Sequence, residues 1–342
     1  MSENKEKIIL DVAYQPQVRT NTDTRRLMLN VLIGLLPAVL VALWQNGIAS
    51  LLMIAVSVAS AVIFEWGYRK LMKKPDSLGD LSACVTGLLL ALVMPTGAKW
   101  WMLIIGNLFA IIVVKQLYGG IGKNFLNPAL AGRAFLLSSY TAIMGSYTLP
   151  AALKGIDGVS SATALSYLKS GAALPEWITM KDLFIGTCAG SIGEISALAI
   201  LIGGIWLIAT KTISWRIPVY YIGSVALICL VSPKGDYSGV QYAVLNVISG
   251  GVMLGAFFMA TDYATSPVTK GGQIVYGIGC GLITVLIRRF GGYPEGVTYA
   301  ILIMNICAWA LDKAFHRHQF GVSKEDLAAA KAAKKAAKEA AK

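Results

Sequence analysis

The sequence predicts an all-α integral membrane protein with about ten transmembrane helices, arranged as two inverted five-helix repeats. Hydrophobic residues make up 56% of the 342 residues and charged residues only 14%, whereas a soluble domain carries about 25% charged residues. The mean hydropathy is +0.64. Apolar runs such as "ALAILIGGIWLIA" are continuous and do not alternate with period two, so they exclude the strands of a membrane β-barrel.

Ten segments approach the length of about 20 apolar residues that a helix needs to cross a bilayer. They are residues 27–44, 50–67, 80–96, 100–116, 126–144, 184–208, 215–232, 239–259, 270–287 and 296–314. The residues before the first segment are polar and end in Arg25 and Arg26. We therefore expect no cleavable signal peptide and a cytoplasmic N-terminus.

These segments predict five regions. We expect a cytoplasmic N-terminal segment at 1–26, a first five-helix half at 27–144, an external loop at 145–183, a second half at 184–314, and a cytoplasmic Ala/Lys-rich tail at 315–342. The tail has strong helix formers but no apolar stripe, which indicates a solvated helix. A polybasic contact with lipid or with another protein of a complex is the alternative.

The net charge of +12 follows the predicted membrane topology and does not form a nucleic-acid surface. With ten spans, most basic clusters fall on the cytoplasmic side, as the positive-inside rule expects. These clusters are Arg25/Arg26, Arg69/Lys70/Lys73/Lys74, Lys115/Lys123, Lys211/Arg216 and the tail, whereas Arg288/Arg289 fall outside. We expect the lipid bilayer as a partner and no nucleic acid.

A short repeated pattern relates the two halves. Pro95 precedes Gly119 of "YGG" by the same 24 residues that separate Pro267 from Gly291 of "FGG". Because five crossings reverse the chain direction, such a repeat must be inverted, which accounts for Arg288 lying outside. Inverted repeats are common in transporters, where the binding site lies at the repeat interface.

The residues that could hold a metal-based electron carrier are scarce. The five cysteines lie in predicted spans without a CxxC pair, so neither a disulfide framework nor a four-thiolate cluster is expected. The only histidines, His316 and His318, are in the tail, which excludes a bis-histidine haem in the membrane. An electron carrier bound here would have to be of another kind.

Two further features stand out within the predicted membrane region. The segment 119–135 contains Asn124, Asn127 and Pro128 where a helix should start, which indicates a re-entrant or interfacial element. Glu194 in "GSIGEIS" is the best candidate for an ion path, because acidic residues inside a membrane are costly. A structural hydrogen bond between helices is an equally good interpretation of Glu194.

The external loop contains the hydroxyl-rich stretch "DGVSSATALS". Taken alone, it predicts that Ser160 or Ser161 caps a short helix that Gly171 ends. A threonine at this place, Thr163, would normally make only local backbone hydrogen bonds. Physical chemistry alone therefore predicts an exposed helix cap.

The same stretch resembles a flavinylation motif, in which an aspartate precedes the modified threonine by six positions. Its residues here are Asp157, Ser160, Ser161, Ala162 and Thr163, with Ser161 where glycine is frequent. Over residues 15–314 the chain also resembles one family of membrane proteins, which contains the D subunit of the Rnf ferredoxin:NAD oxidoreductase and the B subunit of the Na⁺-pumping NADH:quinone reductase. The stretches that carry this resemblance are "YGGIGKNFLNPALAGRAF", "GSIGEISALAILIGG", "GAFFMATDYATSPVT" and "RRFGGYPEGVTYAILIMN".

The resemblance implies two flavins. A flavin transferase would esterify FMN through its phosphate to Thr163, and a second, non-covalent riboflavin would lie in the membrane domain. Polar candidates for the riboflavin site are Asn124, Asn127, Asp262 and Thr265. The chain lacks a dinucleotide fingerprint and a P-loop, so NAD is expected to bind elsewhere in the complex.

The resemblance further implies one subunit of an ion-translocating oxidoreductase in the cytoplasmic membrane of a bacterium or archaeon. Electrons would pass between ferredoxin and NAD and drive Na⁺ or H⁺ export. The implied partners are the A, B, C, E and G subunits of the Rnf complex, above all the FMN-bearing G subunit, with Thr163 on the outer face and both termini cytoplasmic. The alternatives are a component like the B subunit of the quinone reductase, or an inverted-repeat solute channel or transporter.

Overall fold

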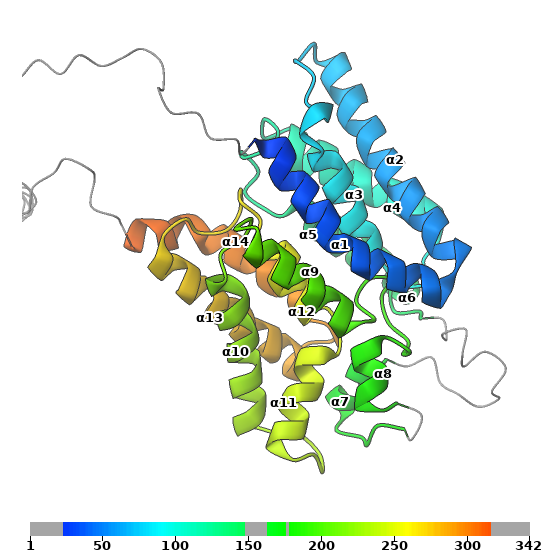
Figure 1. Cartoon of the computed structure of the whole chain (residues 1–342), viewed down its shortest axis with the longest axis vertical. Coiled ribbons are helices and arrows are strands. Elements are labelled where there is room, and N and C mark those ends of the chain that lie inside the picture. Colours follow the sequence, from blue (N-terminus) through cyan, green and yellow to red (C-terminus); the bar gives the residue numbers. More distant parts are fainter. Residues whose placement is uncertain (1–22, 148–162, 176–177, 316–342) are drawn as a thin grey trace, which may run out of the picture.

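The computed structural model describes residues 23–147, 163–175 and 178–315. Within these ranges the regular structure is helical, apart from one isolated bridge between Pro95 and Ser191 (Figure 1). The first half contains α1 (Thr24–Asn46), α2 (Ile48–Leu71), the 3₁₀ turn η1 (Leu78–Asp80), α3 (Ser82–Leu92), α4 (Trp100–Asn107), the π-helix η2 (Leu108–Gln116), α5 (Pro128–Ser139) and α6 (Thr141–Met144).

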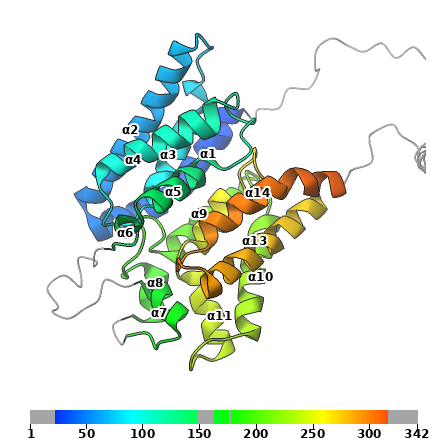
Figure 2. The same cartoon turned by 180° about the vertical axis from the view of Figure 1, so that it is seen from behind.

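Two short helices, α7 (Ala164–Ser170) and α8 (Met180–Ile185), lie between the halves. The second half contains α9 (Ala197–Ala209), α10 (Arg216–Val231), α11 (Gly239–Ile248), α12 (Val252–Leu254), the π-helix η4 (Gly255–Met259), α13 (Lys270–Phe290) and α14 (Val297–Ala314). Figure 2 shows the first-half helices gathered on one side of the molecule and α10, α11, α13 and α14 on the other.

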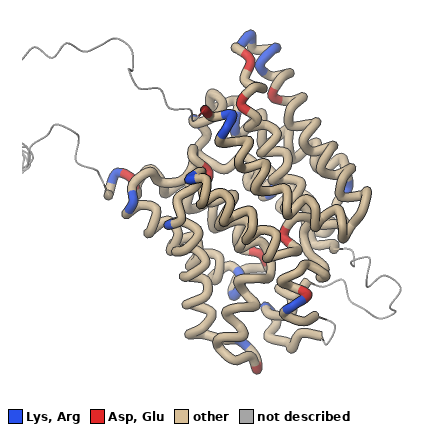
Figure 3. The backbone as a smooth tube through the Cα atoms, in the orientation of Figure 1, with Lys and Arg blue, Asp and Glu red and all other residues tan. Residues whose placement is uncertain are grey.

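The chain is a multi-pass membrane protein. By length and composition four helices can cross a membrane, namely α1, α2, α13 and α14, and α11 with α12–η4 forms a further pair bent by 64°. Large apolar side chains cover their outer faces: Trp44, for example, is 66% exposed and Trp309 74%. Figure 3 shows most charged residues near helix ends and turns, as lipid-facing helices require.

Several predicted spans are not continuous helices. Each of the ten predicted segments contains an apolar helix, but three of these helices are only 11 to 13 residues long: α3, α5 and α9. Prolines and glycines explain the breaks, because Pro95 and Gly97 follow α3 and Pro128 begins α5. The count of ten crossings and the five-region division remain predictions.

One pair of elements that the repeat pattern relates, α3 and the α12–η4 region, runs in opposite directions. The repeated "YGG" and "FGG" motifs are offset by 172 residues (291 − 119), which places α3 on the α12–η4 region. The start of α3, at Ser82, shares a cavity with Asp262, just after the end of η4. The end of α3 and the start of α12 both contact the loop before α9. The amide of Gly193 in this loop donates to the Leu92 carbonyl, and Gly251 lies against Glu194.

The core of the molecule forms around these short central helices. From Leu88 to Met94 every residue is at most 7% exposed. The start of α1 and the end of α14 lie on the side of the molecule away from α7 and α8 (Figures 1 and 2). Two sets of broken helix ends are thereby formed, one near the start of α3 and one near α7.

Candidate functional sites at the broken helix ends

The larger site is a cavity of about 450 Å³, here called the Lys115 cavity. Its walls combine apolar side chains with polar groups at helix ends, and the polar residues include Ser82, Lys115, Asn124, Asn127 and Asp262. Ligand cavities of small molecules are about 300–1,000 Å³, mostly apolar, with a few placed polar groups. The cavity therefore has the size and chemistry of a site for a small organic molecule.

The four polar residues predicted for a second flavin lie together. Asn124, Asn127 and Asp262 line the Lys115 cavity, and the Thr265 hydroxyl donates to Oδ2 of Asp262 at 3.0 Å. Segment 119–135 is non-helical up to Asn127, as predicted, with positive φ at Gly119, Gly120 and Gly122. Its asparagines thereby reach the cavity wall.

Asn127 is also a structural cap. Its side-chain oxygen accepts from the Ala129 and Leu130 amides at the start of α5, and its Nδ2 donates to the Met259 carbonyl at 3.1 Å. The residue therefore ties the start of α5 to the end of η4. Because most of its hydrogen-bonding capacity is used inside the protein, Asn127 shapes the cavity more than it can bind a ligand.

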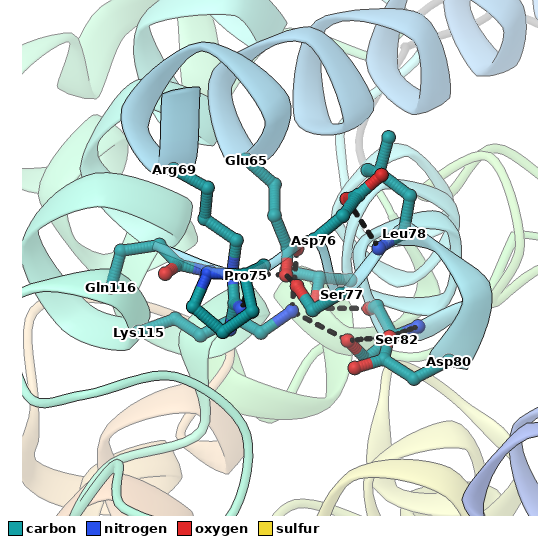
Figure 4. A network of polar contacts seen from close by, with 11 residues as sticks. Glu65, Arg69, Pro75, Asp76, Ser77, Leu78, Asp80, Ser82, Lys115 and Gln116 are labelled. Carbon is teal, nitrogen blue, oxygen red and sulfur yellow. Dashed lines mark hydrogen bonds and ion pairs between the residues drawn. The ribbon is translucent and has the colours of Figure 1, made fainter. Parts of the chain in front are cut away.

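The sequence alone did not predict the charged wall of this cavity (Figure 4). Lys115, expected as a cytoplasmic charge, is only 2% exposed and donates to Oε2 of Glu65 and to the Ser82 hydroxyl, both at 2.6 Å. Glu65 is fully buried, and its Oε1 accepts from Ser77 at 2.7 Å and Gln116 at 3.0 Å. The sequence signal that could have revealed this pair is the single charge in each of two apolar segments, since such charges pair with one another within membranes.

The second site is the start of α7. Thr163 is the N-cap residue in an extended conformation, and its side chain makes no capping hydrogen bond. Its carbonyl accepts from the amide of Ser166 at 2.9 Å and from the hydroxyl of Ser166 at 2.6 Å. Gly171 ends the helix with a φ of +79°, as predicted. The expected cap by Ser160 or Ser161 is wrong, because Thr163 itself occupies the N-cap; Asp157, Ser160, Ser161 and Ala162 lie outside the described residues.

Contacts with the second half hold α7 in place. Leu165 and Leu168 are buried, and Nζ of Lys169 donates to the carbonyls of Gly291 and Gly292 at 2.6 and 2.7 Å. Partial burial, with nearby Lys234, lowers the pKa of Lys169. Thr163 is consequently a partly exposed residue on a fixed helix start.

Behind Thr163 lies a small cavity of about 30 Å³, here called the Thr163 cavity, whose wall includes Ser191, Glu194, Gly250 and Glu295. Glu194 was expected within a continuous span at 184–208. It lies instead in the non-helical loop 186–196 before α9, where Gly190 and Gly193 interrupt the apolar segment. Although Glu194 lies in a loop, it is buried and only 5% exposed.

Glu194 belongs to a charged cluster. Its Oε1 lies 3.5 Å from Nη1 of Arg133, whose Nη2 also forms an ion pair with Glu295. Nη1 of Arg133 further donates to the Thr298 hydroxyl at 3.1 Å. The sequence separation of these residues hides the cluster, which exists only because α5, α14 and the loop before α9 meet.

The described residues contain no group of three or more His, Cys, Asp or Glu side chains able to hold a metal ion. All five cysteines are free, and Cys188 lies in the loop before α9, outside a helix. The two cavities are therefore the candidate sites.

Known proteins resemble this chain over nearly its whole length. The profile of the NQR2, RnfD, RnfE family matches residues 11–321. The chain belongs to this family. It is 47% identical over 319 residues to the D subunit of the Na⁺-translocating ferredoxin:NAD⁺ oxidoreductase complex of Acetobacterium woodii, covering 92% of this chain and 96% of the relative.

Two other relatives of the NQR2, RnfD, RnfE family cover the chain similarly. The D subunit of the proton-translocating ferredoxin:NAD⁺ oxidoreductase complex of Clostridium ljungdahlii is 37% identical, with 93% of this chain and 98% of the relative covered. The D subunit of the ion-translocating oxidoreductase complex of Escherichia fergusonii is 36% identical, with 89% and 96% covered. The family match confirms the resemblance stated from the sequence motifs.

Proposed function

We propose that this chain is the membrane electron-transfer protein RnfD of an Rnf-type complex, which couples electron flow between ferredoxin and NAD to the translocation of Na⁺ or H⁺. The relatives named above are the D subunits of such complexes, and each aligns with about nine-tenths of this chain or more. Their names favour this role over the quinone-reductase alternative and over a solute channel. The chain alone contains no complete active site for the overall reaction.

The first redox group in this proposal is FMN esterified to Thr163 by a flavin transferase. The observation that carries it is the position of Thr163: it is a partly exposed residue at the N-cap of α7, and its side chain makes no capping hydrogen bond. The motif residues Asp157, Ser160, Ser161 and Ala162 precede it. A phosphoester to a fixed residue holds the flavin without a nucleotide-binding domain, and the flavin supplies one- and two-electron chemistry.

The second group is a non-covalent riboflavin in the Lys115 cavity. The volume of about 450 Å³ suits a three-ring ligand. The chain would bind its ring against apolar residues such as Leu89 and Phe258, while Asn124 and Asp262 supply polar contacts. Lys115 would place a positive charge beside the ligand.

The two proposed sites lie at opposite ends of α3. Its 11 residues correspond to about 16 Å of helix. α12–η4 connects the same two places in the opposite direction. We place Thr163 on the outer face and the Lys115 cavity toward the cytoplasm, so that electrons received outside cross half of the membrane through this core.

The proposed partners are the A, B, C, E and G subunits of the Rnf complex, with the FMN of the G subunit as the neighbour of Thr163. Denaturing the purified complex tests the cofactor assignment. We expect one flavin to stay with this chain in the precipitate and riboflavin to appear in the supernatant. A colourless chain with no released riboflavin would contradict both assignments.

A further inference from the structure

Three charged side chains meet behind Thr163. Arg133 comes from α5, Glu194 from the loop before α9, and Glu295 from the turn before α14. Arg133 and Glu194 are 4% and 5% exposed, and the Glu295 side chain is 15% exposed. One guanidinium therefore serves two carboxyl groups in a place that water scarcely reaches.

Among the described residues, Arg133 is the one cation that forms ion pairs with these two carboxyl groups. It can neutralise one of them, and an uncompensated buried charge is costly. Arg288 is a second buried cation nearby, but its guanidinium donates to the neutral carbonyls of Asn246 and Ser249 at the end of α11 and pairs with neither carboxyl group. Tyr147 and Thr298 face the cluster but carry no positive charge.

The hydrogen bonds that the structure describes in this cluster leave one oxygen of the Glu194 carboxyl group without a partner. Oε2 of Glu194 is buried and has no hydrogen-bond partner among the described residues. The carboxyl groups of Glu194 and Glu295 contact the same guanidinium, that of Arg133, and line the same small cavity. Two like charges held this near each other disfavour double ionisation, so the pair favours a state in which one carboxyl group is protonated.

We propose that Glu194 and Glu295 share one proton beside Arg133, and that this pair is a proton-exchange site for the group carried by Thr163. The Thr163 cavity, at about 30 Å³, has room for about one water molecule and is too small for an organic ligand. Glu194, Glu295 and Thr163 all line it. A single water can therefore connect the carboxyl pair to the Thr163 side of the cavity.

A proton fits this site better than a metal cation. The guanidinium of Arg133 repels a cation, and hard cations such as Ca²⁺ take six or more oxygen ligands. A proton needs only two facing carboxyl oxygens. When negative charge arrives at the group on Thr163, the O–H bond of the pair breaks and its proton moves through the cavity; when the charge leaves, the proton returns.

The exchange step depends on the proposed flavin attachment to Thr163, whereas the shared proton does not. Infrared spectroscopy of the purified complex in H₂O and D₂O tests the proton directly, through the C=O band of a protonated carboxylic acid. Glu194→Gln and Glu295→Gln should each abolish the same band, because the remaining carboxylate pairs with Arg133. The matched control is Asp182→Asn in α8. Hydrogen bonds from Thr179 and Thr187 lower the pKa of Asp182 and keep it ionised, so this variant should leave the band unchanged.

Persistence of the band in both assembled glutamine variants would overturn the shared proton. In wild-type complex carrying flavin on Thr163, chemical reduction should diminish the band; in Thr163→Ala it should leave the band unchanged. A band whose intensity does not change when the flavinylated wild-type complex is reduced would overturn the exchange step. Absence of flavin on Thr163 would instead overturn the attachment, and the glutamine variants would still decide whether the proton is shared.

Discussion

Nζ of Lys115 lies 2.6 Å from Oε2 of Glu65, and the two side chains are 3% and 1% exposed. The π-helix η2 carries Lys115 and α2 carries Glu65, so this ion pair fixes one wall of the Lys115 cavity (Figure 4). π-helical turns often occur at functional sites. The pair thereby connects the folding of the first half to the shape of the proposed ligand site.

Removing either partner should destabilise the protein. Breaking a buried ion pair costs about 3–5 kcal/mol, because it leaves an uncompensated charge. We expect Glu65→Gln to be more harmful than Lys115→Met. In Lys115→Met the remaining charge on Glu65 still accepts hydrogen bonds from Ser77 and Gln116, whereas in Glu65→Gln the charge on Lys115 keeps only the Ser82 hydroxyl as a partner among the described residues. Thermal unfolding of the detergent-purified protein measures the effect.

The double variant Glu65→Gln/Lys115→Met provides the control. It removes both charges and should recover much of the stability that either single change loses. Additive losses in the double variant would show that the two side chains act independently and that the ion pair does not stabilise the wall.

Close packing of two glycines gives a second prediction. A Cβ at Gly203 in α9 would lie 1.9 Å from the carbonyl oxygen of Gly34 in α1. Because that neighbour is backbone, Gly203→Ala requires the two helices to separate, and small residues are what allow membrane helices to approach closely. We expect a loss of several kcal/mol, measured as a lower unfolding temperature or loss of folded protein.

Gly223 in α10 is the matched control. A Cβ there would meet nothing within 4 Å. Alanine is a better helix former than glycine by about 1 kcal/mol. Gly223→Ala should therefore leave the unfolding temperature unchanged or raise it; equal damage from both substitutions would contradict the packing argument.

The sequence predicted those features that depend on neighbouring residues. The apolar segments, the non-helical stretch before Pro128 and the end of α7 at Gly171 follow from local composition and backbone preferences. The resemblance directed attention to Asn124 and Asp262, which the structure places on one cavity.

The parts that could not be predicted depend on distant contacts. Glu194 meets Arg133 and Glu295 only after α5, α14 and the loop before α9 have packed together. Lys115 follows the positive-inside pattern when counted along the chain, and only the packing of η2 against α2 shows it to be buried. A span count also treats α3 and α5 as crossings, although the starts of both helices line the Lys115 cavity.

Topology can be tested at described positions. In a cysteine-free background, Lys74→Cys after α2 and Ala172→Cys after α7 both place a thiol at an exposed position. With ten spans and a cytoplasmic N-terminus, a membrane-impermeant thiol reagent added to intact cells should label the thiol at position 172 and spare the one at position 74. In inside-out vesicles the labelling should reverse, and the same sidedness for both positions would contradict the predicted topology.

The last prediction concerns Thr163 itself. If its hydroxyl is esterified to FMN, a denaturing gel should show a flavin-fluorescent band at the mass of this chain, because a phosphoester survives detergent. Thr163→Ala should abolish that fluorescence and stop electron transfer through the complex. It should leave the abundance of the chain nearly unchanged, since the side chain makes no capping hydrogen bond in α7.

Thr163→Ser is the informative companion, because it keeps a hydroxyl at the N-cap and removes only a methyl group. Any fluorescence that it retains must come from transfer to the serine oxygen. Ser166→Ala is the matched control: the Ser166 hydroxyl bonds the Thr163 carbonyl, so its loss affects the helix start but not the attachment atom. Fluorescence that persists in Thr163→Ala, or an unmodified Thr163 peptide from active complex, would return this residue to the role of a plain helix cap.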